Sequence, residues 1–301
     1  MKQCINSEDL NQKTGMDETV LDRLSPFLSL LGLDEEPMGI FYTDDKPVSG
    51  LSPKPGPLPT LEREQKNEVD WQKVFGRFSC AMGHIWRARK KTCAAYFSAE
   101  RFGCAGGAFW LGFLKPQTET VVNYVSTGIP NRVPGELYCE SPQQLRQIFE
   151  RVDPEPAPRT YCVFKPIRQF EKDEIPDLVV FFTRPEPLSG LHQLATFVTN
   201  DPEVVKSPWG AACGNIVVWP YHYLSKGENK AVLGGWDPSA RKFFSTDELS
   251  FTVPFSMFLD MINRYQDSFL TQKAWQIVRK KISLSKKALH RSPSPSEQEG
   301  V

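Results

Sequence analysis

The chain has 301 residues, with 36 Lys and Arg against 36 Asp and Glu, so its formal net charge is zero at neutral pH. This balance argues against a generally basic nucleic-acid-binding protein and against an acidic, solvating chain. Hydrophobic residues make up 40% and charged residues 24% of the chain, which is ordinary for a globular protein with a sizeable buried core.

The first half of the chain alternates predicted helices with shorter strands. Residues 1–16 are polar, and we expect them to be disordered. Leucine and phenylalanine recur at helical spacing over residues 21–31, where Pro26 is expected to break or kink the helix. A strand is predicted at 38–42, and apolar residues spaced from 71 to 85 predict a second helix.

The second half is richer in predicted strands. Apolar, β-branched and aromatic runs predict four of them, at residues 160–166, 177–183, 215–219 and 249–253. A helix is expected over 185–200, and Pro254 marks the start of another. Because helices and strands are interspersed, the sequence predicts an α/β or α+β fold, with one mixed-sheet domain and flanking helices over residues 17–270.

Residues 271–301 differ from the rest in charge. They carry seven Lys and Arg against two Glu, a net charge of +5, so the remaining 270 residues carry −5. Trp275, Val278 and Ile282 share a helical face within this segment. We expect a basic helix followed by a disordered tail, which packs on the acidic body or contacts an acidic membrane or nucleic acid. Nucleic-acid binding by the body itself is not expected.

The apolar segments and the cysteines indicate the cellular compartment in which the protein is expected. The N-terminus lacks the apolar core of a signal peptide, and no apolar stretch approaches the ~20 residues of a membrane-spanning helix. The seven cysteines are spread along the chain without a Cys-x-x-Cys pair. We therefore expect a cytoplasmic protein with no membrane span and with reduced thiols.

A glycine-rich stretch, Gly103-Cys104-Ala105-Gly106-Gly107, precedes an apolar helix. Glycines in this position can leave backbone N–H groups open to an anion, although the known nucleotide-binding patterns are absent. The same pattern places Cys104 at a helix N-terminus, where its thiolate is favoured. The alternative is that the glycines form an ordinary turn or allow close packing.

Cys80, Cys104 and Cys213 are the cysteines that we associate with a site. Cys104 and Cys213 have small neighbours, so that a ligand could approach them closely. The three could converge as ligands of a metal or an iron–sulfur cluster, or each could be a small buried hydrophobe. His84 follows Cys80 by four residues, so the two could bind a metal or act as nucleophile and base. A helical histidine that merely packs is the alternative.

A tight turn is expected at Gly234-Gly235-Trp236-Asp237-Pro238, and it leads to Arg241. The guanidinium of Arg241 could meet an anionic ligand at this turn. The alternative is a hairpin turn without a binding role.

The order and spacing of several segments resemble the uncharacterised family called domain of unknown function 169. The matching segments are 31–41, Cys80-Ala81, 103–108 with 111–112, 176–181, and 211–214 before Pro220. The resemblance covers about residues 21–265 and implies a shared fold unit, not an activity. Relatives often carry a further Cys-x-Gly-x-Arg stretch, whose equivalent here, 233–236, has no cysteine. A four-cysteine metal site is therefore in doubt.

The leading hypothesis from the sequence is a binding module with a cysteine- and glycine-lined pocket. Its expected ligand contacts are Gly103, Cys104, Gly106, Gly107, Cys213, Gly214 and Arg241. The ligand would be a metal held by Cys80, Cys104 and Cys213, an iron–sulfur centre, or a small anionic molecule. One alternative is a thiol-dependent enzyme with Cys104 as nucleophile and with His84 or another nearby group as its base. Another is a regulatory or interaction protein whose partner binds the basic tail.

Overall fold

The computed structural model describes residues 18–71, 80–115, 118–152, 154–171 and 174–289. The disorder expected for residues 1–16 and for the end of the tail, 290–301, therefore lies outside the described residues. So does the first part of the helix expected over 71–85.

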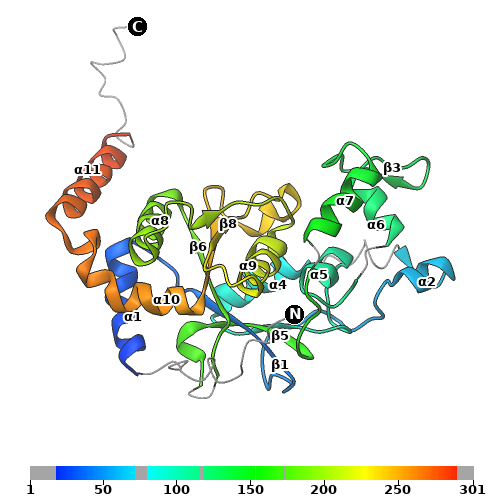
Figure 1. The fold of residues 1–301 in the computed structure, drawn as a ribbon, viewed down its shortest axis with the longest axis horizontal. Coiled ribbons are helices and arrows are strands. Elements are labelled where there is room, and N and C mark those ends of the chain that lie inside the picture. The colour runs from blue at the N-terminus through cyan, green and yellow to red at the C-terminus, as the bar shows by residue number, and fades with distance from the viewer. Residues whose placement is uncertain (1–17, 72–79, 116–117, 153, 172–173, 290–301) are drawn as a thin grey trace, which may run out of the picture.

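A seven-stranded mixed sheet forms the centre of the protein (Figure 1). Its strands are β1 (Met38–Thr43), β2 (Ala95–Phe97), β5 (Tyr161–Pro166), β6 (Leu178–Thr183), β7 (Val205–Lys206), β8 (Ala231–Gly234) and β9 (Leu249–Pro254). Their order across the sheet is β2-β5-β1-β6-β9-β8-β7. Only β7 and β8 pair in parallel, and the other neighbours are antiparallel. The strands expected at 38–42, 160–166, 177–183 and 249–253 are confirmed.

Both faces of the sheet are covered, as the central strand β6 shows. All six of its residues are buried. Val179 and Phe181 point into the core on one face, and Leu178, Val180 and Phe182 point into the core on the other. A strand buried on both sides has no polar face, which explains its uninterrupted apolar sequence.

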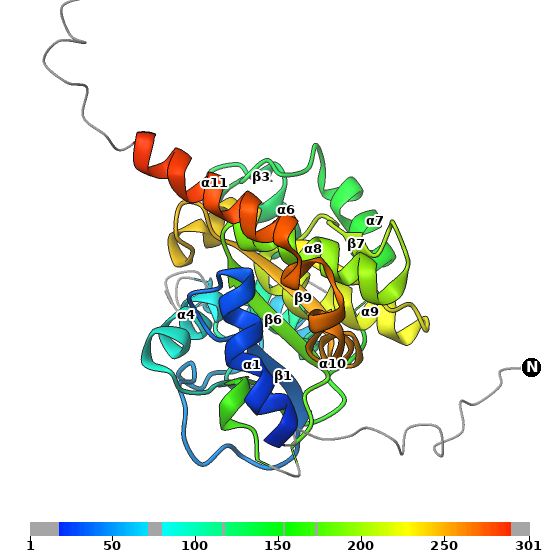
Figure 2. The same cartoon turned by 90° about the vertical axis from the view of Figure 1, so that its left-hand side faces the viewer.

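Helices flank the sheet on its two faces, which confirms the expected mixed α/β architecture. The first core includes residues of α1 (Glu18–Leu31), α8 (Pro185–Thr199) and α10 (Phe255–Arg264), and α11 (Lys273–Leu289) contacts it through Trp275. Figure 2 shows α1, α10 and α11 from this side. The second core includes α4 (Ala81–Lys91), α5 (Ala105–Trp110) and the π-helix η2 (Gly214–Val218).

Beside the second core, α6 (Glu119–Val125) and α7 (Pro142–Val152) pack together with the small hairpin of β3 (Gly128–Ile129) and β4 (Val133–Pro134). The other short elements are α2 (Leu61–Gln65), α9 (Trp219–Ser225) and the 3₁₀ helices η1 (Ile167–Gln169), η3 (Pro238–Phe243), η4 (Tyr265–Asp267) and η5 (Phe269–Thr271). Within the described part of the chain, no helix combines the length and apolarity needed to cross a membrane.

One local expectation was wrong. The run predicted as a strand at 215–219 is helical, and it forms η2 and the start of α9. Ile216, Val217 and Val218 are buried all round, and a short run with no polar face does not distinguish a strand from a buried helix. Of the break or kink expected at Pro26, the break does not occur, because α1 continues through this residue. Pro26 lies on the exposed face, where water can satisfy the carbonyl that loses its partner.

Candidate functional site

A cavity of about 660 Å³ lies on the face of the sheet that carries α4, α5 and η2. Segments far apart in the sequence line it: the starts of α4 and α5, α6, the chain around residues 136–138 and 207–215, and the segment 236–243. We call it the thiol cavity because three cysteines, Cys80, Cys104 and Cys213, are among its lining residues. The structure thus brings together the three cysteines that the sequence suggested could converge.

Cys80 and Cys104 each immediately precede a helix, because Cys80 is the N-cap of α4 and Cys104 that of α5. The expectation that Cys104 lies at a helix N-terminus is confirmed. Its sulfur accepts a hydrogen bond from the Gly107 amide at 3.2 Å. Only glycine fits at 107, because an added Cβ would lie 2.7 Å from the carbonyl oxygen of Phe102.

The Cys104 sulfur is surrounded by hydrogen-bond donors. The thiol of Cys80 donates to it, and so do the amides of Gly107 and Ala81. These bonds, the one from Cys80 above all, lower the pKa of Cys104 to about 7, although burial and the nearby charge of Asp237 act in the opposite direction. Cys104 therefore has substantial thiolate character at neutral pH, which is the reactive form of a cysteine.

The other two cysteines are held as thiols. The pKa of Cys80 is raised because its proton is shared with Cys104, and burial adds to the effect. Burial raises the pKa of Cys213 well above its usual value, and the charge of Cys104 raises it further. Among the described residues, no group of three or more His, Cys, Asp or Glu side chains is arranged to hold a metal ion. The metal and iron–sulfur hypotheses thus gain no support from this arrangement.

Aromatic rings form much of the wall of the thiol cavity. They are Trp110, Tyr124, Tyr138, Phe149, Trp209, Trp236 and Phe243. Trp209 and Trp236 remain 42% and 53% exposed, which is unusual for such large apolar side chains. Exposed rings at the rim of a hollow are typical of a site that covers a ligand.

The ionisable side chains of the cavity wall, apart from its cysteines and tyrosines, are Glu136, Asp237 and Lys242. Burial raises the pKa of Glu136, against the effect of a hydrogen bond from Tyr124. With Cys104 as a thiolate, negative charge prevails in the cavity. This balance does not favour the small anionic ligand that the sequence suggested.

Asn215 is a further polar residue of the cavity wall, and it is only 1% exposed. Its amide nitrogen donates to the carbonyl of Pro208 at 2.8 Å. Its Oδ1 atom has no hydrogen-bond partner among the described residues. A buried acceptor without a partner is costly to stability.

Four of the residues expected at the site do not line the cavity: Gly103, Gly214, His84 and Arg241. Gly103 adopts a φ of +82° in the turn before α5. Gly214 supports the wall from behind, because an added Cβ would lie 2.5 Å from the Trp110 indole. Of the expected glycines, Gly106 and Gly107 do line the cavity.

His84 is buried on α4 and packs edge-on against Phe97. Burial, with a contribution from Arg87, lowers its pKa to about 4. The imidazole is therefore neutral at physiological pH. Since His84 does not line the thiol cavity, the structure gives no support to its expected role as the base for Cys104.

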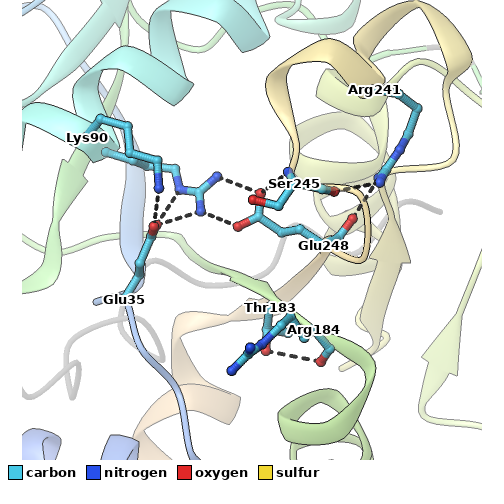
Figure 3. Close-up of polar contacts among 8 residues, drawn as sticks. Glu35, Lys90, Thr183, Arg184, Arg241, Ser245 and Glu248 are labelled. Atoms are coloured by element: carbon cyan, nitrogen blue, oxygen red, sulfur yellow. Dashed lines mark hydrogen bonds and ion pairs between the residues drawn. The ribbon is translucent and has the colours of Figure 1, made fainter. Parts of the chain in front are cut away.

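Arg241 has a structural role in place of the expected ligand contact. Its guanidinium donates to the carbonyl oxygens of Gly235, Glu248, Ser245 and Thr246, as Figure 3 shows for Ser245 and Glu248. These bonds fix the loop between β8 and β9, and that loop supplies one wall of the cavity. Arg241 therefore shapes the site without touching its interior.

Glu248 also ties this loop to the neighbouring layer. Its carboxylate accepts two hydrogen bonds from Arg89 of α4, at 2.5 and 3.2 Å. The guanidinium of Arg89 bonds Glu35 as well and lies 3.9 Å from the centre of the Phe182 ring. This buried network holds α4, and hence Cys80, against the loop that carries Trp236.

Sequence reasoning missed most of the cavity wall, including Trp209, Trp236, Glu136 and Asn215. A signal was present at two positions. Trp209 and Trp236 each sit among Gly, Pro and Ser residues, at Ser207-Pro208-Trp209-Gly210 and Gly234-Gly235-Trp236, where a large ring has no obvious core to enter.

The fold and the site define a three-layer α/β protein with an aromatic, thiol-lined cavity on one face of its sheet. The family model named DUF169, described as "Uncharacterised ArCR", matches residues 27–264, and the chain belongs to this family. Comparison with curated proteins gave no significant match, nor did comparison with solved structures.

Proposed function

We propose that this protein binds a small organic molecule in the thiol cavity, and that the ligand has a flat apolar or aromatic part and no net negative charge. The observation that carries the proposal is the wall of seven aromatic rings around a space of about 660 Å³, within the range of small-molecule sites. Rings such as Trp209 and Trp236 would stack on a flat ligand or contact a cation through their π faces.

The charges in the cavity support the second half of the proposal. Glu136, Asp237 and the Cys104 thiolate outweigh Lys242. A positive or neutral ligand avoids repulsion in this enclosed space, where charges act more strongly than in water.

Calorimetric titration with three naphthalene probes tests this proposal. At neutral pH, 1-naphthylmethylamine is cationic, 2-naphthol is neutral and 2-naphthoate is anionic, while the aromatic body is shared. We expect the cation to bind about tenfold more tightly than the anion, a difference of ~1.4 kcal/mol. Absence of binding by all three probes, or preference for the anion, would contradict the proposal.

Gly106 offers a matched pair of variants to place that binding in the cavity. It lines the cavity, and an added Cβ meets no atom closer than 3.9 Å. Gly106→Ala should therefore leave probe binding nearly unchanged, whereas the longer side chain of Gly106→Leu should fill the space and weaken binding at least tenfold. Equal binding by both variants would mean that the probes bind elsewhere.

A second candidate function is thiol-dependent catalysis with Cys104 as the nucleophile. The lowered pKa of Cys104, caused chiefly by the hydrogen bond from Cys80, favours it, because a thiolate is the attacking species. The same cavity would then hold the substrate beside the sulfur.

Affinity labelling tests this candidate against ordinary thiol reactivity. N-benzyl iodoacetamide and iodoacetamide share the reactive carbon, but only the first carries an aromatic ring. The measured quantity is the ratio of the labelling rate with N-benzyl iodoacetamide to the rate with iodoacetamide. We expect this ratio to be about tenfold higher at Cys104 than at Cys93, a half-buried cysteine that does not line the cavity. An equal ratio at both cysteines would contradict catalysis by Cys104 on a substrate held in the cavity.

A further inference from the structure

Cys80 and Cys104 both line the thiol cavity. The start of α4 lies against the Cys104 sulfur, because a Cβ added at Gly107 would be 3.4 Å from the Cβ of Ala81 and 3.5 Å from that sulfur. The opposite pKa shifts of the two thiols are those of sulfurs that share a proton. They reach this position from two separate helices, since each residue is the N-cap of its own helix, α4 or α5. Closure of a disulfide bond, with its S–S length of ~2.05 Å, requires two sulfurs to be neighbours, as sulfurs that share a proton are.

We propose that Cys104 and Cys80 act together in thiol–disulfide exchange, with Cys104 as the attacking thiolate and Cys80 as the resolving thiol for a small disulfide that enters the cavity. The inference rests on the proposed role of Cys104 as a nucleophile and adds a partner residue and a substrate class to it.

The reaction balances with the disulfide as the oxidant. The Cys104 thiolate attacks one sulfur of R–S–S–R, so that a Cys104–S–S–R bond forms and one R–S⁻ leaves. Cys80 then passes its proton to a departing thiolate and attacks the Cys104 sulfur. The products are a Cys80–Cys104 disulfide, one R–SH and one R–S⁻, which takes up a proton from water according to its pKa. The protein pair has given two electrons and the single Cys80 proton to the substrate.

The surroundings of the pair suit this sequence of steps. Ala105 and Gly106 line the cavity beside Cys104, and a Cβ at Gly106 would still lie 4.0 Å from the Cys104 sulfur. These small residues leave room for a substrate sulfur to approach. The amides of Ala81 and Gly107, which bond the Cys104 sulfur, stabilise the thiolate before attack.

Cys213 lines the same cavity but is a poorer resolving thiol. The pKa of Cys213 responds to the charge of Cys104, but no hydrogen bond links the two, whereas Cys80 shares its proton with Cys104. Cys213 is also buried, while Cys80 and Cys104 are half-buried. Cys93, Cys139 and Cys162 do not line the cavity at all, so Cys80 is the resolving residue that the geometry selects among the described cysteines.

The test uses the full chain and bis(2-hydroxyethyl) disulfide, a small uncharged probe. After incubation and acid quenching, free thiols are alkylated, and intact and peptide mass spectrometry identify each product. We expect wild-type protein to form a Cys80–Cys104 disulfide without a retained adduct. Cys80→Ser should keep one mercaptoethanol adduct on Cys104, because the serine hydroxyl cannot resolve it, and Cys104→Ser should form neither product.

Cys93→Ser is the matched control, because Cys93 does not line the cavity, and it should behave as wild type. An adduct that persists on Cys104 in wild-type protein, or a disulfide that joins Cys104 to Cys213, would contradict the role of Cys80 as the resolving thiol. The same experiment tests the nucleophile apart from the resolving thiol. If Cys104 is the nucleophile, Cys80→Ser carries the mercaptoethanol adduct, whether or not the wild-type protein forms a disulfide. The presence or absence of a Cys80–Cys104 disulfide-linked peptide from wild-type protein tests the proposal even if a serine variant does not fold.

Discussion

Gly214 shows how tightly single residues of the cavity wall are packed. An added Cβ would lie 2.5 Å from the Trp110 indole, and forcing an extra carbon into a packed core typically costs about 1–3 kcal/mol. We expect Gly214→Ala to lower the free energy of unfolding by about that amount and to weaken probe binding, because Trp110 lines the cavity. Urea denaturation followed by circular dichroism measures the first effect. Gly106→Ala is the control, and equal stability of the two variants would contradict this packing.

At the scale of residues, the sequence could locate Cys104 but not its partner. The glycine-rich pattern correctly predicted a helix beginning just after Cys104. The hydrogen bond from Cys80 could not be predicted from the sequence, because it depends on how the starts of α4 and α5 meet across the second core. His84 looked equally suitable from its spacing, yet its imidazole packs on Phe97. Spacing along one helix does not reveal which neighbouring element each side chain meets.

The loop between β8 and β9 is the element whose shape depends most on one side chain. Arg241 bonds four of its carbonyl oxygens, a pattern that matches the planar fork of a guanidinium but not a lysine ammonium. We expect Arg241→Lys to lower the free energy of unfolding by about 2 kcal/mol and to weaken probe binding, measured by urea denaturation and calorimetry. Arg23→Lys, at a single exposed bond to Asn263, should change stability by less than about 0.5 kcal/mol. Similar losses in both variants would count against this role of Arg241.

At the scale of elements, helices and strands were predicted correctly where one face of the element is buried or where the residues strongly favour a strand. The β-branched and aromatic run of β6 was predicted correctly. The comparable run 215–219 was not, because it is buried within a helical layer where apolar side chains point in all directions. The result matters for the site, since this segment carries Asn215 and follows Cys213. A π-helix often occurs at functional sites.

The basic C-terminal segment joins the body through the first turns of α11. Trp275 packs edge-on against Phe269, with ring centres 5.1 Å apart, and donates to the carbonyl of Leu30. Lys286 pairs with Glu186 of α8. The expectation that this helix packs on the acidic body is therefore met for part of its length, while a contact of the tail with an acidic partner stays a prediction.

Whole-molecule stability should reflect this attachment. Trp275→Ala removes a half-buried ring from the edge of the first core, and we expect a loss of about 2 kcal/mol in the free energy of unfolding. Ile277→Ala changes an exposed residue of the same helix and should cost less than about 0.5 kcal/mol. Urea denaturation of both variants checks the difference. If they were equally stable, α11 would not be held by Trp275.

For the whole molecule, composition and pattern gave the mixed sheet with helices on its flanks, since these follow from local periodicity. They could not give the strand order, because β1 lies between β5 and β6, far from its sequence neighbours. That order places the starts of α4 and α5 beside η2 and so creates the thiol cavity. The site is thus a product of topology, and only its cysteines, its glycines and the turn at Gly234-Gly235-Trp236-Asp237-Pro238 were predicted from the sequence.

The most direct test of the central claim, a Cys104 thiolate stabilised by Cys80, is the pH dependence of Cys104 alkylation by iodoacetamide. The rate follows the thiolate fraction, so wild-type protein should reach half its maximal rate near pH 7. Cys80→Ala removes the donor and should move the midpoint to higher pH, whereas Cys80→Ser, whose hydroxyl can still donate, should move it less. A wild-type midpoint at the ordinary cysteine pKa of ~8.5, unchanged in Cys80→Ala, would contradict the account.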